Sequence, residues 1–231
     1  MIVNLIDGGM IFELNKKYKD CGEYAVNNDT KLLDDIYKSY INMGCKYITT
    51  PNYCFKPGYT KNWENLVKKS INITNKFKKN IKIFGCLPPF NKSYSDSNIN
   101  HEFIFFYNKI IDIFCNNVDY YLIETATNYK EIKKIYELIK ERDKTTPIII
   151  SLYPCKEHNI YIDTYLNMEI YGLFINCCSF ENMELFYNQN FKNKKFGFYC
   201  NKINEKEYSQ KKKIKDLQNY FNDLSIEKKK N

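Results

Sequence analysis

The sequence lacks several features that define large classes of proteins. No stretch reaches the roughly 18 consecutive apolar residues of a membrane-spanning helix, and no basic segment followed by a long apolar run opens the chain. The Walker-type phosphate loop and the G-x-G-x-x-G pattern of dinucleotide-binding folds are also missing. We therefore expect no membrane association, no secretory signal and no nucleotide site of these types.

The nine cysteines are odd in number and lack the regular spacing of a disulfide framework. This usage favours reduced thiols, so we expect a cytoplasmic protein. The formal net charge is +8, but the basic residues are spread over expected helix faces and are densest near the C-terminal end. A nucleic-acid binder gathers such charge in a patch with exposed aromatic residues, so we expect no nucleic-acid partner.

Apolar runs that are typical of buried strands alternate with segments of helical periodicity along the chain. In the first long helix of this series, Asp29 or Thr30 can cap the start, Leu33 and Tyr37 share an apolar face, and Gly44 ends it. The expected strands are residues 2–7, 46–50, 81–86, 119–125, 147–152, 171–177 and 195–200, and the expected helices are residues 29–44, 60–77, 103–114, 128–141, 162–168, 180–188 and 207–224.

Seven strand–helix units predict an α/β fold with a parallel sheet, either doubly wound or a (β/α)8 TIM-like barrel that lacks its eighth unit. We see no internal repeat beyond this alternation and no interior linker. We therefore expect one domain over residues 1–224, followed by a basic tail without fixed structure at residues 225–231. An open edge of a parallel sheet favours association, so we also expect a homodimer.

Polar residues stand where the expected strands end, which is the edge where α/β proteins place their chemistry. Asp7 and Glu124 could together hold an ammonium group, and glycines let a ligand approach the backbone closely. Hydroxyl groups at the strand ends could bind a carboxylate. Each residue alone also fits a turn, a helix cap or a core position, but together they suit an amino acid. The substrate-binding candidates are Asp7, Gly8, Gly9, Thr49, Thr50, Glu124, Ser151 and Asn176.

Five motifs occur in the order known from one family. They are "DGGMIFEL" from Asp7, "CKYITTPNY" from Cys45, "GCLPP" from Gly85, "NNVDYYLIET" from Asn116 and "LFINC" from Leu173. These segments resemble the motifs D-G-G/A-M-G-T-E-L, A-D-x-I-x-T-N-T-Y, G-S-I-G-P, A-G-x-D-L-L-x-x-E-T and G-x-N-C of the homocysteine S-methyltransferase family. The resemblance covers nearly the whole chain.

The resemblance implies a (β/α)8 barrel in which zinc, held by three cysteine thiolates, binds the thiol of homocysteine. Zinc favours the thiolate, which attacks a methyl group on a sulfonium, ammonium or pterin donor and yields methionine. Asp7 and Glu124 would hold the amino group of homocysteine, and Cys177 matches the first zinc ligand. The identity of the methyl donor stays open.

The chain departs from the family at the remaining zinc ligands, which are an adjacent Cys-Cys pair at the end of the eighth strand. No such pair follows the seventh expected strand, and Cys177-Cys178 belongs to the sixth. Neighbouring side chains of a strand point to opposite faces, so this pair does not suit one ion. Cys200 ends the seventh strand and is a candidate second ligand. Catalytic zinc usually has three protein ligands.

Two functions therefore stay open. The first is homocysteine S-methyltransferase activity with zinc, for which other cysteines or a second chain would complete the metal site. The second is a catalytically weak or inactive barrel scaffold that binds a small amino acid or a protein partner. Further substitutions favour the second function: Ile11 and Phe12 replace the family's Gly-Thr, and Phe106 stands about where members carry a helix histidine.

Overall fold

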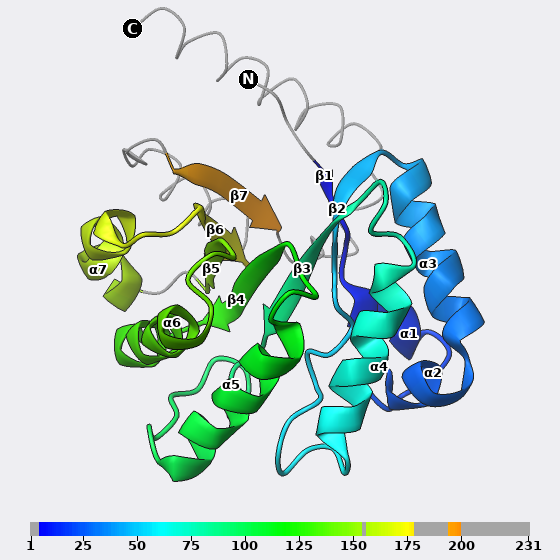
Figure 1. Cartoon of the computed structure of the whole chain (residues 1–231), viewed down its shortest axis with the longest axis horizontal. Coiled ribbons are helices and arrows are strands. Elements are labelled where there is room, and N and C mark those ends of the chain that lie inside the picture. Colours follow the sequence, from blue (N-terminus) through cyan, green and yellow to red (C-terminus); the bar gives the residue numbers. More distant parts are fainter. Residues whose placement is uncertain (1–4, 154–155, 178–193, 200–231) are drawn as a thin grey trace, which may run out of the picture.

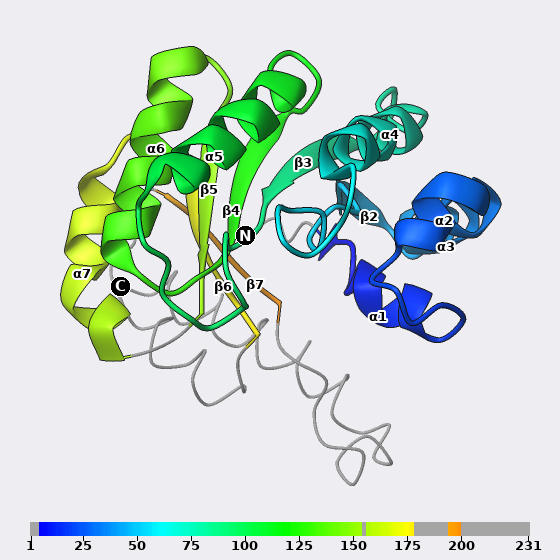
Figure 2. The ribbon, with the colours of Figure 1, turned by 90° about the horizontal axis from the view of Figure 1, so that it is seen from below.

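The structure is a computed structural model that describes residues 5–153, 156–177 and 194–199. Seven parallel strands form one sheet in sequence order, from β1 to β7. The sheet curls into a half-barrel with helices along its outer side (Figure 1, Figure 2). The strands are β1 (Leu5–Ile6), β2 (Cys45–Thr49), β3 (Lys82–Leu87), β4 (Tyr120–Ala126), β5 (Ile148–Leu152), β6 (Gly172–Asn176) and β7 (Lys195–Tyr199).

The helices that the structure describes lie between consecutive strands, as expected for parallel pairing. Side-chain caps begin several of them: Asp29 accepts a hydrogen bond from the Leu32 N–H, and Asn100 accepts one from the Phe103 N–H. The helices are α1 (Met10–Asn15), α2 (Glu23–Asn28), α3 (Thr30–Asn42), α4 (Trp63–Asn75), α5 (His101–Phe114), α6 (Tyr129–Arg142) and α7 (Lys156–Asn167). None of these helices is both long enough and apolar enough to cross a membrane.

Two apolar layers hold the half-barrel together. Neighbouring residues of a strand point to opposite faces of the sheet, and β3 shows this with Ile83 and Phe84. Ile83 belongs to the large cluster between the sheet and the helices, which also contains Ile150 and Phe106. Phe84 belongs to a smaller cluster on the inner face with Leu122. Burial on both faces explains why the strands are apolar throughout.

The expected fold class is confirmed, because the chain forms a TIM-barrel-like parallel sheet and the described residues contain no eighth strand. Within that part of the chain, β1 pairs with β2 alone and β7 with β6 alone. The expected helices at 180–188 and 207–224, like the tail at 225–231, lie outside the described residues. The single domain over residues 1–224 stays a prediction.

The sequence patterns do not predict α1 and α2. Each helix has six residues, which is too short for a clear helical period. Tertiary packing forms them instead, since α1 buries Met10 and Leu14 and α2 buries Ala25 and Val26. The weak helix expected at residues 162–168 is also longer in the structure, where α7 begins at Lys156.

Candidate functional site

Asp7 follows β1 at the rim formed by the carboxyl ends of the strands. Its carboxylate accepts a 2.8 Å hydrogen bond from the Thr49 N–H and a 2.9 Å hydrogen bond from the Thr49 hydroxyl. Asp7 is only 5% exposed. Burial raises the pKa of Asp7 to about 8; the bonds from Thr49 oppose this shift, and the nearby Glu124 charge adds to it.

Glu124 lies near the end of β4 and is bonded to two other strands. The Cys86 thiol on β3 donates to its Oε2 atom at 2.9 Å, and the Tyr199 hydroxyl on β7 donates to its Oε1 atom at 3.2 Å. Burial raises the pKa of Glu124, while these two hydrogen bonds oppose that shift. Burial also raises the pKa of Cys86 well above its usual value, so Cys86 remains a protonated donor.

A second network joins the ends of β4, β5 and β6 around Asn176. Its side-chain oxygen accepts a 3.0 Å hydrogen bond from Ser151, and its amide donates to the Thr125 hydroxyl at 2.7 Å. The same amide lies 3.2 Å from the sulfur of Cys177. Thr125 and Cys177 have positive φ angles of 53° and 55°. Non-glycine residues in this region are strained and tend to gather at functional sites.

Thr50 connects β2 to β3 through a closed set of hydrogen bonds. Its hydroxyl accepts from the Cys86 N–H at 2.9 Å and donates to Asn52 at 2.6 Å, and the Asn52 amide returns to the Cys86 carbonyl at 3.0 Å. The hydroxyls of Thr49 and Ser151 likewise donate to protein acceptors. Any of these three hydroxyls would have to exchange a partner in order to donate to a substrate carboxylate.

Gly8 and Gly9 are exposed and lead from Asp7 into α1. A Cβ atom at Gly8 would lie 2.7 Å from the Tyr40 hydroxyl oxygen and 3.1 Å from the ring of Tyr40. A side chain at this position would therefore require the partly exposed Tyr40 side chain to shift. Because Gly8 and Gly9 have no side chains, the backbone beside Asp7 is open to solvent.

The structure brings most of the predicted substrate-binding residues into these rim networks. Sequence reasoning did not identify Cys86, Asn52 and Tyr199 as their partners. Cys86 ends an expected strand, and this position could have identified it as a residue of the rim. The hydrogen bonds of Asn52 and Tyr199 depend on tertiary contacts that the sequence pattern does not show. The predicted residues that join the networks are Asp7, Thr49, Thr50, Glu124, Ser151 and Asn176.

The residues that the structure describes do not assemble a metal centre. No group of three or more His, Cys, Asp or Glu side chains suitable for a metal ion occurs among them. Cys177 is half-buried at the rim, and Cys86 is engaged by Glu124. Cys178 and Cys200 lie outside the described residues. The described cysteines therefore do not provide the three protein ligands that catalytic zinc usually has.

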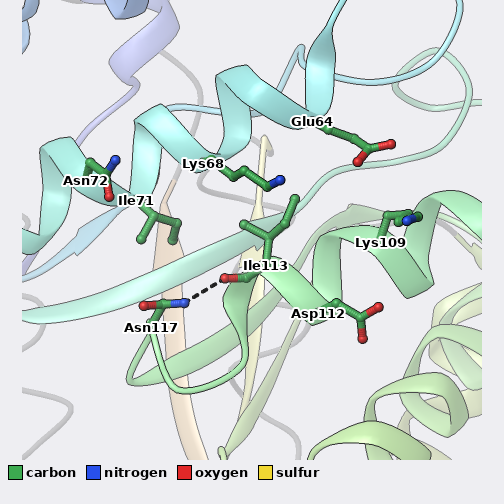
Figure 3. A pocket seen from close by; sticks show the side chains of 8 residues that line it. All are labelled: Glu64, Lys68, Ile71, Asn72, Lys109, Asp112, Ile113 and Asn117. Atoms are coloured by element: carbon green, nitrogen blue, oxygen red, sulfur yellow. Dashed lines mark hydrogen bonds between the residues drawn. The ribbon is translucent and has the colours of Figure 1, made fainter.

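A separate cleft of ≈ 380 Å³ lies between α4 and α5 on the helical side of the molecule (Figure 3). Its lining includes the charged side chains of Glu64, Lys68, Lys109 and Asp112. None of the predicted site residues lines it. It shares no residue with the rim networks, so we assign it no part in the site.

Comparisons with known proteins agree with this architecture. The homocysteine S-methyltransferase family model matches residues 4–225. The metallated form of the homocysteine methyltransferase MmuM from Escherichia coli is similar, with a TM-score of 0.71 and 15% identity over 89% of this chain and 86% of that chain. The oxidized form gives a TM-score of 0.69 and 14% identity, over 87% of this chain and 92% of that chain. No curated protein matches at the sequence level.

The solved structures are too different in sequence to show more than the fold. The family match is the stronger finding because it spans nearly the whole chain, including every predicted rim residue. The chain therefore belongs to the homocysteine S-methyltransferase family.

Proposed function

We propose that the rim binds L-homocysteine and that the chain transfers a methyl group to its sulfur. In this reaction the thiol loses its proton and the sulfur forms a bond to the methyl carbon. The bond between that carbon and the donor breaks, and its electron pair stays on the donor. The observation that carries the proposal is the place of two carboxyl groups at the carboxyl ends of the strands in a chain of this family, the buried Asp7 after β1 and the partly exposed Glu124 on β4.

The ammonium group of an amino acid is the ligand that suits this pair. Asp7, with a pKa raised to about 8 by burial, is largely protonated in the free protein near neutral pH. An ammonium group favours the ionised carboxylate, so binding should release a proton from Asp7. Thr49 fixes the orientation of Asp7, while Cys86 and Tyr199 fix that of Glu124. Both carboxyl groups are thus oriented before a ligand arrives.

Zinc enters the proposal through the family, in which it would make the homocysteine thiol a better nucleophile. Cys177 is the proposed first ligand and Cys200 the proposed second. Because the described residues do not gather three ligands, we propose weak zinc binding and slow methyl transfer for the isolated chain. The same observation favours the second candidate function, a catalytically weak or inactive scaffold that binds a small amino acid or a protein partner.

Binding to the amino group can be tested separately from catalysis. Isothermal titration with L-homocysteine should give an affinity that falls at least about tenfold in Asp7→Asn, the loss expected for a charge-assisted hydrogen bond. Affinity for 4-mercaptobutanoate, which has the thiol and the carboxylate but lacks the amino group, should not depend on Asp7. Equal losses for both ligands, or no homocysteine binding at millimolar concentration, would reject an ammonium site at Asp7.

Metal content and product formation separate the two candidate functions. About one zinc per chain, together with methionine formed from homocysteine and a sulfonium, ammonium or pterin donor, would support the methyltransferase. Homocysteine binding with no zinc and no methionine would support the scaffold. Participation in methionine biosynthesis, a cytoplasmic location and a homodimer belong to the same proposal, and size-exclusion chromatography with light scattering tests the homodimer.

A further inference from the structure

Lys56, in the segment between β2 and α4, is a buried lysine with only 3% of its surface exposed. Its ammonium group donates to the Pro89 carbonyl at 2.7 Å and also to the Asn91 carbonyl, and it lies 4.6 Å from the centre of the Tyr59 ring. Within the described part of the chain, its partners are thus two backbone carbonyls and a ring rather than a carboxylate. A buried charge without an opposite charge is costly, and an apolar side chain of the same length would avoid that cost.

The two carbonyls that Lys56 binds stand on either side of Phe90. We call residues 88–91 the Phe90 loop. The Phe90 ring lies 5.7 Å from the ring of Phe103 and 5.7 Å from that of Phe106, and both of these side chains are fully buried on α5. The Phe90 loop is therefore held by α5 through its apolar ring and by Lys56 through its backbone.

Other contacts join the same two segments closer to the sheet. The Thr50 hydroxyl accepts from the Cys86 N–H at 2.9 Å, and the Asn52 amide donates to the Cys86 carbonyl at 3.0 Å. The Tyr53 and Ser93 hydroxyls lie 2.7 Å apart. In most of these contacts the segment after β2 supplies a side chain and the segment after β3 supplies a backbone group. Side chains of the first segment therefore set the path of the second, and Lys56 supplies the charge among them.

The Phe90 loop borders the space beside Glu124. Leu87, Pro89, Tyr107 and Glu124 are among the residues that line a small cavity at the ends of β3 and β4. The Tyr107 hydroxyl also donates to the Pro88 carbonyl at 2.8 Å. The position of Pro89, which Lys56 holds through its carbonyl, therefore determines one wall of the cavity that Glu124 shares.

We propose that Lys56 is a positioning residue of the rim, whose charge fixes the Phe90 loop as a wall beside Glu124. Hydrogen bonds from a charged donor are about twice as strong as neutral ones. An apolar side chain can fill the space of Lys56 but cannot bind the Pro89 and Asn91 carbonyls, so without the charge the loop leaves its place more often. This inference rests on the proposed function only for the reason that the wall matters, because Glu124 is there a binding group for homocysteine.

Digestion with chymotrypsin near pH 7 measures how often the Phe90 loop leaves its place, because cleavage after Phe90 requires its ring to leave α5. Burial lowers the pKa of Lys56 to about 8, so the ammonium form still dominates at this pH. Lys56→Met should raise the rate of this cleavage at least about tenfold, the loss expected for a charge-assisted hydrogen bond. Its free energy of urea unfolding should not fall, because the cost of the buried charge is removed. Lys61→Met, at an exposed lysine of the same segment, is the matched control.

Lys56→Ala separates the charge from the volume of the side chain. It removes the heavy atoms that make up n-propylammonium. Added n-propylammonium should therefore return the cleavage after Phe90 towards the wild-type rate, whereas 1-propanol, which has the same size and no charge, should not. If Lys56→Ala does not fold, Lys56→Met still decides the outcome.

Modification of Cys86 by methyl methanethiosulfonate, resolved by peptide mass spectrometry, shows whether the effect reaches Glu124. Cys86 is fully buried and donates to Glu124, so Lys56→Met should raise its modification rate severalfold, with no change at Cys45, a buried thiol at the start of β2. Wild-type rates at either Phe90 or Cys86 in Lys56→Met, faster reaction at Cys45 as well, or equal rescue by 1-propanol would overturn the proposal. Homocysteine is absent from these assays, so their failure leaves the proposed function to its own test.

Discussion

Replacing Asp7 with Asn should remove a pH dependence of stability that the buried carboxyl group imposes. The Asn side chain has nearly the same shape, and its oxygen can still accept the hydrogen bond from the Thr49 N–H. Its amide can donate to the Thr49 hydroxyl, which now donates to the carboxylate. The substitution therefore removes the titrating proton while it keeps both hydrogen-bond partners.

The size of the effect follows from the pKa of Asp7, which is about 8 in the folded protein against an ordinary value of 3.8. The folded state holds the proton more tightly than the unfolded state does. Asp7 therefore contributes stability that is present below pH 4 and is lost as the pH rises towards 8. Between pH 5 and pH 7 the loss is at most about 1.4 kcal/mol per pH unit, or about 2.7 kcal/mol in total.

Urea unfolding of wild type and Asp7→Asn at pH 5, 6 and 7 measures this contribution. Other titrating groups affect both proteins equally and cancel in the difference between their free energies of unfolding. This difference should increasingly favour the variant as the pH rises. Asp35→Asn is a suitable control, because the exposed Asp35 is paired with Lys31 and its pKa is lowered by that contact. If the free energies of unfolding of wild type and Asp7→Asn change in parallel from pH 5 to pH 7, Asp7 is not a buried ionisable group with a raised pKa.

Three further substitutions test the core, a helix cap and the metal ligand. Phe106→Ala should lower the free energy of urea unfolding by about 3–5 kcal/mol, because Phe106 is fully buried against Trp63. Its neighbour Phe105 is exposed, so Phe105→Ala should change this free energy by less than about 0.5 kcal/mol. Asn128→Ala should cost about 1 kcal/mol in the same assay, because the Asn128 side chain caps α6 by accepting from two backbone N–H groups; a cost near zero would mean that water replaces the cap. Cys177→Ser should change the zinc content of the purified chain little, and a tightly bound stoichiometric zinc that disappears in this variant would contradict the weak site proposed above.

The sequence was most informative where residue chemistry and strand periodicity coincide. Asp7, Glu124 and Asn176 could be placed at one rim because parallel strands end at the same edge of a sheet. This inference needs only the strand order, which the alternation of strands and helices supplies. It does not need the register or the side-chain rotamers, and it is therefore robust to errors of one or two residues at strand boundaries.

The partners of these residues could not be predicted in the same way. Lys56 is one of 35 basic residues, and nothing in its sequence context separates it from the exposed ones. Its burial results from two connecting segments, after β2 and after β3, that come together only in the folded chain. The contact of Tyr94 with Tyr153 has the same origin. The loops after strands have no hydrophobic periodicity from which their contacts could be predicted, so only the tertiary structure shows these contacts.

The inner face of the half-barrel explains how the rim can form on seven strands. Large aromatic side chains meet there, with Tyr47 and Tyr120 5.0 Å and 5.3 Å from the ring of Phe84. These rings bury much apolar surface with few residues, so the strands hold their curvature where the described sheet does not close. Thr49 ends β2 and Glu124 lies on β4, which both pair with a strand on each side, and Asp7 follows β1, which pairs with β2 alone in the described sheet. In the family that the sequence motifs resemble, the Cys-Cys pair ends an eighth strand. The proposed amino-acid side of the site therefore rests on strands that the described sheet contains, whereas the proposed thiol-activating side would need a strand that the described residues do not contain. This placement is the physical reason to expect that amino-acid binding outlasts methyl transfer in this chain.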